Sequence, residues 1–363
     1  LIGVQYVASF GLIIGATFMY LQNYYMQNTP LGYDKDEIII TNMNNNIRKS
    51  RDAFASQVKS FSGIEEVTYA EMLLSSHDQY MGWGRKYRDK DIQFQCLPVE
   101  PSFLKVMNVK ISEGRDFREE DKAKRYGTFV FNERARTEYG LEIGSLIDSM
   151  EIVGFMPDVK FASFRTEVTP MAFFVWGTNN WGNQPNYAYI KVKAGSDLRG
   201  AMQHVKTTLQ SFDPEYPFNV RFFDEVLNGL YEKERSLSSL ITLFSLIAIF
   251  ISVVGVFGLV VFDSEYRKKE IGIRKVLGST TEEIIVMFNK TYIRILCVCF
   301  VLGAPIAGYV VHRWLENFAY KTPMYWWVYL IAFAIIAVIT ILTVTFQNWR
   351  AANENPVHSI KNE

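Results

Sequence analysis

The long apolar run at residues 236–262 contains no charged side chain. A transmembrane helix needs roughly 20 consecutive apolar residues, so this run is long enough to cross a bilayer. A second run at 295–311, diluted by Pro305 and several glycines, carries no charge either. The segment 265–279 between the two runs is strongly basic. Because Lys and Arg flanking transmembrane helices are retained on the cytoplasmic side, the sequence predicts that this loop faces the cytoplasm.

Apolar residues gather at the two ends of the chain. Residues 1–33 have no charge, 34–235 are polar and mixed, and the remainder is dominated by three apolar runs. Two membrane-embedded regions enclosing one water-soluble domain is the simplest physical account, because backbone polar groups within lipid must be paired inside helices or barrels. The predicted fold class is therefore an α-helical membrane protein, with four transmembrane helices and a large extracytoplasmic α+β domain between the first and second.

The predicted topology places both termini in the cytoplasm and residues 34–235 outside. The chain does not begin with Met, so we expect it to be part of a longer parent protein. The predicted order is transmembrane helix 1 at 1–22, the extracytoplasmic domain with stalk extensions at 23–235, helix 2 at 236–262, a cytoplasmic coupling loop at 263–291, helix 3 at 292–314, a short external loop at 315–325, helix 4 at 326–349 and a cytoplasmic tail at 350–363.

The polar segment has the patterns of both strands and helices. Alternating or β-branched runs predict strands at 37–41, 66–70, 92–96, 128–131, 151–155, 172–176, 187–193 and 217–221. Helical spacing predicts helices at 50–61, 102–107, 133–139 and 197–212, the last with Asp197 as its N-cap. Two strand-helix-strand sets, near the start and the end, indicate a split βαβ core with an inserted subdomain at about 94–186.

Residues that carry chemistry are sparse. The chain has no Gly-x-x-x-x-Gly-Lys-Ser/Thr phosphate loop, so we expect it not to be an enzyme and any ATPase activity to reside on a partner chain. Cys96, Cys297 and Cys299 lack metal spacing, and the four histidines are scattered. No catalytic residue, cofactor or metal is predicted. The formal net charge is zero, which gives no bias toward nucleic acid.

Two features of the predicted spans bear on packing and transport. Gly11 and Gly15 form a Gly-x-x-x-Gly pattern that would let another helix approach closely, although a packing role and no role are equally compatible with it. Charged residues are absent from the interiors of the spans, and Arg294 lies near the start of the third. A permeation pathway would ordinarily leave charge within the membrane, so conduction is disfavoured.

Taken together, the motifs resemble the FtsX/MacB-type ABC transporter permeases along nearly the whole chain. Residues 267–279, RKKEIGIRKVLGS, are similar to the family's segment between its second and third spans. The tail 349–361, WRAANENPVHSIK, resembles its closing Asn-Pro-Val motif. Residues 103–117 and 152–155 resemble its periplasmic core domain. The opening, through 25–35, resembles the second half of the double-length permeases of Bacteroidota-like bacteria.

The resemblance implies that a cytoplasmic ABC ATPase dimer docks on the basic loop. Basic side chains would meet acidic partner surface, Ile271 would supply an apolar anchor, and the glycines would allow close backbone approach. On charge alone the cluster needs only to fix topology, and the motif match favours docking. The implied ATPase-coupling residues are Lys268, Lys269, Glu270, Ile271, Gly272, Arg274, Lys275 and Gly278.

The implied function is mechanotransmission, in which ATP hydrolysis drives periplasmic conformational work without passing substrate through the membrane. The expected cargo is antimicrobial peptides, drugs such as macrolides, or lipoproteins, which would be exported or extracted. An alternative is an FtsX-like signalling module that activates a periplasmic cell-wall hydrolase, and a third is a sensor with no ATPase. The implied partners are the ATPase, a second permease half or protomer, a periplasmic adaptor or hydrolase, and lipid of the bacterial inner membrane.

Overall fold

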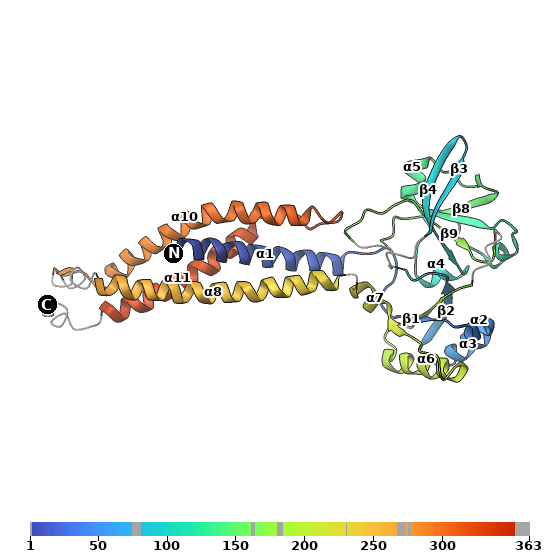
Figure 1. Cartoon of the computed structure of the whole chain (residues 1–363), viewed down its shortest axis with the longest axis horizontal. Helices are drawn as coiled ribbons and strands as arrows, with labels where there is room; N and C mark the ends of the chain where they lie inside the picture. Colours follow the sequence, from blue (N-terminus) through green and yellow to red (C-terminus); the bar gives the residue numbers. More distant parts are fainter. Residues whose placement is uncertain are drawn as a thin grey trace. The chain divides into compact units, whose positions relative to one another are not determined.

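The structure of the chain, a computed structural model, describes residues 2–74, 81–160, 164–179, 184–229, 231–266, 273–274 and 277–352. The chain divides into two compact units (Figure 1). We call residues 1–28 and 233–363 the helical unit and residues 29–232 the α+β domain.

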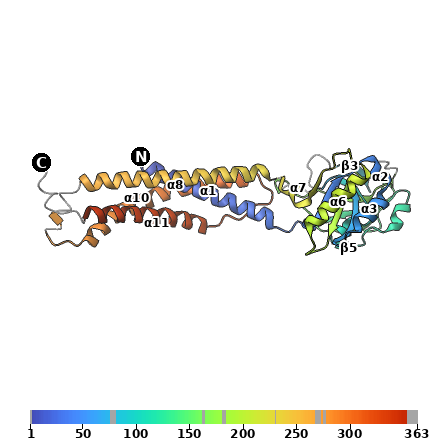
Figure 2. The same ribbon diagram turned by 90° about the horizontal axis from the view of Figure 1, so that it is seen from below.

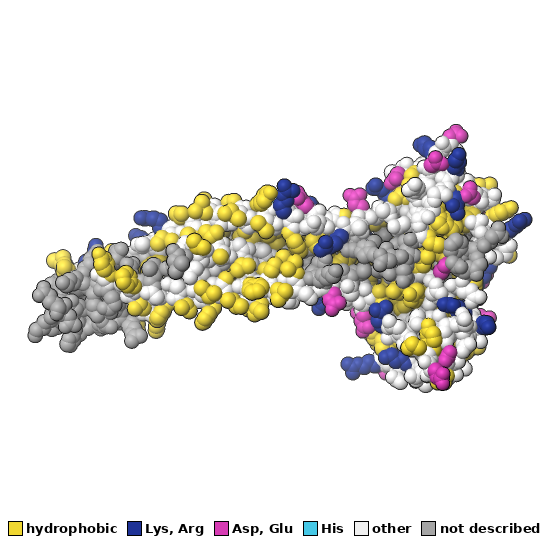
Figure 3. Space-filling model, viewed as in Figure 1, with side chains coloured by type: hydrophobic (Ala, Val, Ile, Leu, Met, Phe, Trp, Pro, Cys, Tyr) yellow, Lys and Arg dark blue, Asp and Glu magenta, His cyan; other side chains and the backbone are white. Residues whose placement is uncertain are grey.

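Four long helices make up most of the helical unit: α1 (Ile2–Asn28), α8 (Glu232–Tyr266), α10 (Thr281–Leu315) and α11 (Trp327–Ala352). Each is long and apolar enough to cross a membrane. The helices lie side by side in two perpendicular views (Figure 2). Hydrophobic side chains cover much of their outer surface, whereas charged side chains gather on the α+β domain (Figure 3). The predicted class of a four-helix membrane protein with an α+β domain is confirmed.

Three of the four helices share one apolar core. Tyr6, Phe10 and Phe18 of α1 are buried against side chains of α10 and α11, and the rings of Phe10 and Phe333 stack with centroids 6.4 Å apart. By contrast, α8 is largely uncovered within the chain. Only 11% of its most apolar window is buried, compared with 39% for α1. Most of the apolar surface of α8 is therefore available to lipid or to another protein.

The α+β domain is built on one continuous sheet. Its strands are β1 (Ile38–Asn42), β2 (Ile64–Ala70), β3 (Met81–Tyr87), β4 (Lys90–Val99), β5 (Glu113–Gly114), β6 (Thr128–Asn132), β7 (Leu146–Ile147), β8 (Met150–Met156), β9 (Met171–Val175), β10 (Tyr187–Val192) and β11 (Val220–Phe222). The order is β11-β1-β10-β2-β4-β9-β6-β8-β5, with β3 paired to β4 and β7 paired to β8.

Two interlocked βαβ units form one half of this sheet. The first is β1, α2 (Asn45–Lys49), α3 (Arg51–Lys59) and β2, and the second is β10, α6 (Leu198–Phe212) and β11. As predicted, Asp197 caps α6, accepting a hydrogen bond of 3.0 Å from the Gly200 amide. Phe54 and Val58 of α3 pack with Val205 of α6 against the sheet. The split βαβ core of the predicted fold class is confirmed.

The inserted subdomain lies between these units in sequence and continues the sheet. It adds the short helices α4 (Phe103–Val106), η1 (Glu119–Ala123) and α5 (Glu133–Tyr139). Its core is rich in aromatic rings. Phe94 lies 4.9 Å from Phe131 and 5.7 Å from Phe129 between ring centroids, in edge-to-face arrangements that favour one defined packing. A second core, which includes Phe103, Phe173 and Tyr189, joins the subdomain to the βαβ units.

Candidate functional site

The segment that leads into α10 is a capped helical turn. Gly278 has a φ of +95°, in the left-handed region that glycine favours, and the Ser279 amide donates to the Arg274 carbonyl over 2.9 Å. This bond spans six residues around a left-handed glycine, which is the Schellman arrangement that closes a helix C-terminus. Thr280 then caps α10, and its hydroxyl and the Glu283 carboxylate form a reciprocal capping box. Two helix ends are thus fixed within a few residues.

Two apolar side chains of this turn are uncovered. Ile273 is 57% exposed and Leu277 is 80% exposed. Both lie beside Arg274, one of the predicted coupling residues, which is also exposed. Exposed apolar side chains next to a cation suit a protein interface, where apolar anchors carry most of the binding energy. Within the predicted coupling loop 263–291, the structure describes 263–266, 273–274 and 277–291, and the described residues of this turn belong to the last two ranges.

The other predicted coupling residues lie outside the described residues. They are Lys268, Lys269, Glu270, Ile271, Gly272 and Lys275. Their role in coupling stays a prediction, as does that of Arg274 and Gly278.

Gly11 and Gly15 line an apolar cavity. A Cβ atom added at either glycine would meet no heavy atom within 4 Å. The cavity has a volume of about 540 Å³ and lies between α1, α10 and Ile241 of α8, with Gly303 and Ala307 on its α10 side. The small residues of α1 therefore leave open space within this chain. Their packing role stays a prediction for a helix outside it.

A different glycine brings α1 and α10 together. A Cβ added at Gly303 would lie 3.4 Å from the Cα of Val7. Gly303 is not part of a Gly-x-x-x-Gly pattern, because Cys299 and Ala307 occupy the positions four residues before and after it. Sequence reasoning missed it for that reason.

Hydrogen bonds of serine side chains connect α1 to α8. The hydroxyls of Ser9 and Ser252 are 2.8 Å apart, and Ser245 donates to the Leu12 carbonyl over 3.0 Å. The two helices run in opposite directions, so these contacts follow one another along the pair. Interhelical hydrogen bonds of this kind contribute about 0.6 kcal/mol each in a membrane protein. The contact between α1 and α8 therefore includes several polar groups, and of α8 the partly buried Ile249 packs against the apolar core that α1, α10 and α11 share.

Gln22 ties α1 to the connection between α10 and α11. Its side chain is fully buried, donates to the Tyr320 carbonyl over 3.1 Å and accepts from the Thr322 amide over 2.8 Å. Both polar ends of the carboxamide are thus used. A buried amide that is fully paired fixes the geometry of the groups around it. No sequence pattern marks this contact, because its partners are backbone groups about 300 residues away.

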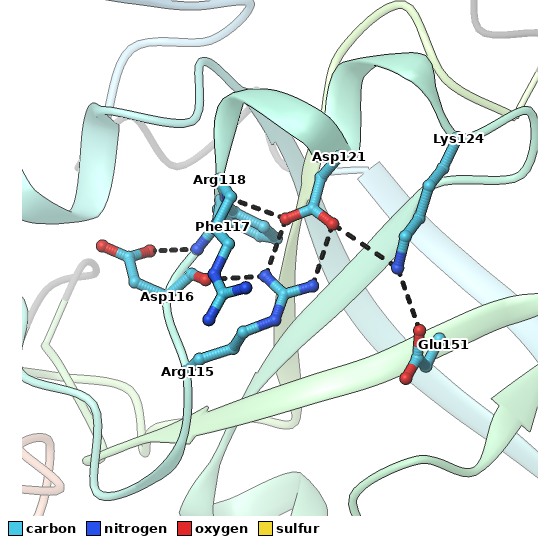
Figure 4. Close-up of polar contacts among 7 residues, drawn as sticks. All are labelled: Arg115, Asp116, Phe117, Arg118, Asp121, Lys124 and Glu151. Carbon is cyan, nitrogen blue, oxygen red and sulfur yellow. Dashed lines mark hydrogen bonds and ion pairs between the residues drawn. The ribbon is translucent and has the colours of Figure 1, made fainter.

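A cluster of charged residues stabilises the inserted subdomain (Figure 4). Asp121 of η1 is buried and accepts two hydrogen bonds from the Arg115 guanidinium, at 2.8 and 2.9 Å, and one from the Arg118 amide at 2.8 Å. Lys124 lies 3.5 Å from Asp121 and 3.0 Å from Glu151 of β8. Although several acidic residues in a row usually form a solvated turn, Asp121 here is buried in a bidentate pair with Arg115.

The pKa values of the two aspartates in this turn move in opposite directions. Burial would raise the pKa of Asp121, but hydrogen bonds from Arg115 and the Arg118 amide outweigh it and lower the pKa. Burial raises the pKa of Asp116 to about 6, and the Phe117 amide and Arg115 oppose this only in part. Among the residues that the structure describes, no group of His, Cys, Asp or Glu is arranged to hold a metal ion.

Comparison with known protein families gives two matches. The model described as "MacB-like periplasmic core domain" matches residues 3–208, and the model described as "FtsX-like permease C-terminal" matches residues 242–356. Together they cover residues 3–356 except for 209–241.

Among curated proteins, the macrolide export ATP-binding/permease protein MacB of Chromobacterium violaceum is 23% identical over 230 residues. The protein of the same name from Escherichia coli strain K12 is 23% identical over 233 residues. Each alignment covers 60% of this chain and 35% of the relative. The chain therefore spans about a third of the length of the curated relatives it matches.

Solved structures also resemble the chain. The periplasmic region of MacB from Actinobacillus actinomycetemcomitans has a TM-score of 0.41 at 14% identity, and covers 55% of this chain and 95% of that one. The extracellular domain of the ABC-type transporter YknZ from Gram-positive bacteria has a TM-score of 0.37 at 12% identity, and covers 51% and 99%.

Proposed function

Because the chain belongs to the family of FtsX-like permeases with a MacB-like periplasmic core domain, we propose that it couples ATP hydrolysis on a separate ATPase to conformational work in the α+β domain. The single observation that carries this proposal is the capped turn before α10. It presents Ile273 and Leu277 to solvent, and its two helix ends are fixed by Gly278 and Thr280. A capped turn with exposed apolar side chains suits a contact through which the ATPase would displace α10.

In this proposal the loop faces the cytoplasm of a bacterium, the α+β domain lies in the periplasm, and the helices cross the inner membrane. A second permease half or protomer covers the apolar surface that α8 leaves open. Displacement passes along α1 and α8, which both connect directly to the α+β domain. A helix rises 1.5 Å per residue and is stiff enough to carry such a displacement across a bilayer.

The proposed cargo is a molecule that is already in the periplasm or the outer leaflet of the membrane. The curated relatives are named for macrolide export. For this chain, drugs, antimicrobial peptides and lipoproteins are all compatible with work done outside the membrane. A periplasmic adaptor would then contact the α+β domain.

The decisive experiment is copurification of the ATPase with a charge-reversed loop. Lys268, Lys269, Arg274 and Lys275 are changed to Glu in the full chain, coexpressed with an ABC ATPase from the same organism. We expect at least a tenfold loss of copurified ATPase. The matched control reverses four exposed cations of the α+β domain, Lys90, Lys110, Arg199 and Lys206, and should retain the ATPase. Equal recovery of the ATPase from both variants would contradict docking on the loop. Absence of the ATPase even from the unmodified chain would favour a membrane sensor without an ATPase.

An alternative function is an FtsX-like signalling module that activates a periplasmic cell-wall hydrolase. The match of residues 242–356 to the FtsX-like model supports this alternative. Both functions use the same cytoplasmic coupling and differ in what the α+β domain touches. Crosslinking from this domain in cells distinguishes them, since an adaptor would be captured in the first case and a hydrolase in the second.

A further inference from the structure

Two short segments join the α+β domain to the membrane helices. Residues 29–37 follow α1 and lead into β1, and α7 (Phe223–Gly229) with Tyr231 follows β11 and leads into α8. A flexible linker as long as 29–37 has a root-mean-square span of roughly 15 Å. Such a linker would absorb ångström-scale displacements of a helix. Transmission therefore requires that these junction segments be held.

The segment after α1 is held by the connection between β8 and β9. The Lys160 amide donates to the Leu31 carbonyl over 2.8 Å, and the Tyr33 hydroxyl donates to the Lys160 carbonyl over 3.4 Å. Gly32, with a φ of +90°, lies directly against Val159, so that an added Cβ would be 2.7 Å from Val159 Cγ1. Val159 itself is buried. Residues 31–33 are thus in close contact with Val159 and Lys160 of the β8–β9 connection.

The segment before α8 is held by the same connection. The Phe164 amide donates to the Tyr231 hydroxyl over 3.0 Å, and the two rings are in edge-to-face contact at 6.1 Å. Phe164 is buried. The two junction segments also touch one another, because the rings of Tyr33 and Phe223 lie 5.8 Å apart. Segments almost 200 residues apart in sequence, 31–33 and 223–231, therefore meet at one place.

We propose that Val159, Lys160 and Phe164, which we call the junction clasp, are positioning residues that stiffen both junctions so that displacement of α1 and α8 reaches the α+β domain. The inference rests on the proposed function. The covalent connections of both helices run to β1 and β11 of the βαβ core, whereas the clasp belongs to the β8–β9 connection of the inserted subdomain. Both parts of the domain therefore contact both junction segments.

Two backbone amides of the clasp are bonded to the junction segments. The amides of Lys160 and Phe164 donate outside their own segment, to groups of the two junctions. A backbone amide in an ordinary surface connection is bonded to water or to its own turn. Here the two amides instead donate to Leu31 and Tyr231, in the two junction segments.

The first test measures hydrogen exchange in the full chain in detergent, and requires no ATPase. Tyr231→Phe removes the acceptor of the Phe164 amide and keeps the ring, so we expect exchange at Phe164 to accelerate at least fivefold. Gly32→Ala introduces the clash with Val159 and should accelerate exchange at Lys160. Unchanged exchange at both amides would overturn the clasp.

Each variant has a matched control in the same domain. Tyr216→Phe removes a hydroxyl that accepts from Asn42 on the βαβ core, away from both junctions. Gly195 has a φ of +74°, with nothing within 4 Å of an added Cβ, so Gly195→Ala imposes similar backbone strain without the clash. Neither control should alter exchange at Phe164 or Lys160.

The second test measures transmission in the chain assembled with its ATPase in nanodiscs. Spin labels at Arg235 and Lys206 report the distance between the start of α8 and the α+β domain, with ATP and with ADP. We expect a nucleotide-dependent distance change in the unmodified chain and in both controls. The double variant Gly32→Ala, Tyr231→Phe should retain ATP hydrolysis and lose at least half of that change.

The outcomes separate the clasp from the proposed function. If the double variant keeps the full distance change, the clasp is overturned and the proposed function stands. If the unmodified chain neither associates with an ATPase nor responds to ATP, the proposed function fails and the clasp loses its role with it.

Discussion

Asp116 and Asp121 occupy the same turn of the inserted subdomain, and their surroundings separate their chemistry. The Arg115 guanidinium bonds both oxygens of Asp121, which keeps that carboxylate ionised. Asp116 accepts from the Phe117 amide and is partly buried with little further compensation. One aspartate therefore stabilises the turn at neutral pH and the other destabilises it.

We predict that Asp116→Asn stabilises this turn at neutral pH. The folded-state pKa is raised from 3.8 to about 6, so the folded state binds the proton more tightly than the unfolded chain. The stability that the protonated Asp116 carboxyl contributes is thus fully present below about pH 4, and it is lost as pH rises through about 6. Because Asp116 is partly exposed, we expect a gain on the order of 1 kcal/mol at pH 7.5. Hydrogen exchange of the β5 and β8 amides measures this gain in stability. A gain that persists at pH 4 would contradict a raised pKa of Asp116 as its cause.

We predict the opposite effect for Asp121→Ala. It removes both bonds of the Arg115 guanidinium to the carboxylate and the acceptor of the Arg118 amide, at a cost of about 2 kcal/mol, and leaves Arg115 its bond to the Asp116 carbonyl. Its pKa is lowered, so the wild-type contribution is present above the unfolded-state pKa and disappears as pH falls through the lower folded-state value. The control is Glu142→Gln, which breaks an ion pair with Arg88 whose partners are 60% and 64% exposed. The control should change stability by less than about 0.5 kcal/mol.

At the scale of elements, the helical unit contains two kinds of helix contact. α1, α10 and α11 share an apolar core and are further tied by Gln22, whereas α8 meets α1 through Ser9, Ser245 and Ser252. Breaking an apolar core requires exposing packed surface, but exchanging one serine hydrogen bond for another costs little. We infer that α8 is the helix best able to shift against the other three.

We predict that Gln22→Leu loosens the connection between α10 and α11. The substitution leaves the Thr322 amide and the Tyr320 carbonyl without their partner, which costs about 1–3 kcal/mol where these groups are buried. Exchange at the Thr322 amide should accelerate. Thr17→Val is the control, because the Thr17 hydroxyl bonds only the Ile13 carbonyl of its own helix among the contacts described. Equal exchange in the two variants would show that Gln22 does not hold this connection.

Individual elements differed in how well their sequences predicted them. The helix at 198–212 was predicted with its cap, because Asp197 and the periodic apolar residues are local signals. β3 was missed. Gly82, Gly84, Arg85 and Lys86 dilute its pattern, and only Trp83 and Tyr87 are buried. β3 forms because all of its residues pair with β4, and because its two core side chains join the aromatic cluster.

At the scale of the whole molecule, sidedness is the testable consequence of the charge distribution. In a chain whose three cysteines are replaced by Ala, single cysteines are placed at Arg274 and at Lys206. We predict that an impermeant thiol reagent labels position 206 in cells with a permeable outer membrane, and labels position 274 only after the inner membrane is opened. Labelling in the reverse order would contradict the positive-inside assignment.

The sequence alone determined the four membrane helices, the α+β domain between them and its split βαβ core. These follow from composition and short periodic patterns, which depend on neighbouring residues. Tertiary structure decided the burial of Gln22, the pairing of Ser9 with Ser252 and the junction clasp. Each joins groups from distant parts of the chain, and two of them use backbone atoms, which are the same in every residue and leave no pattern to read. Only the folded chain brings such partners within hydrogen-bonding distance.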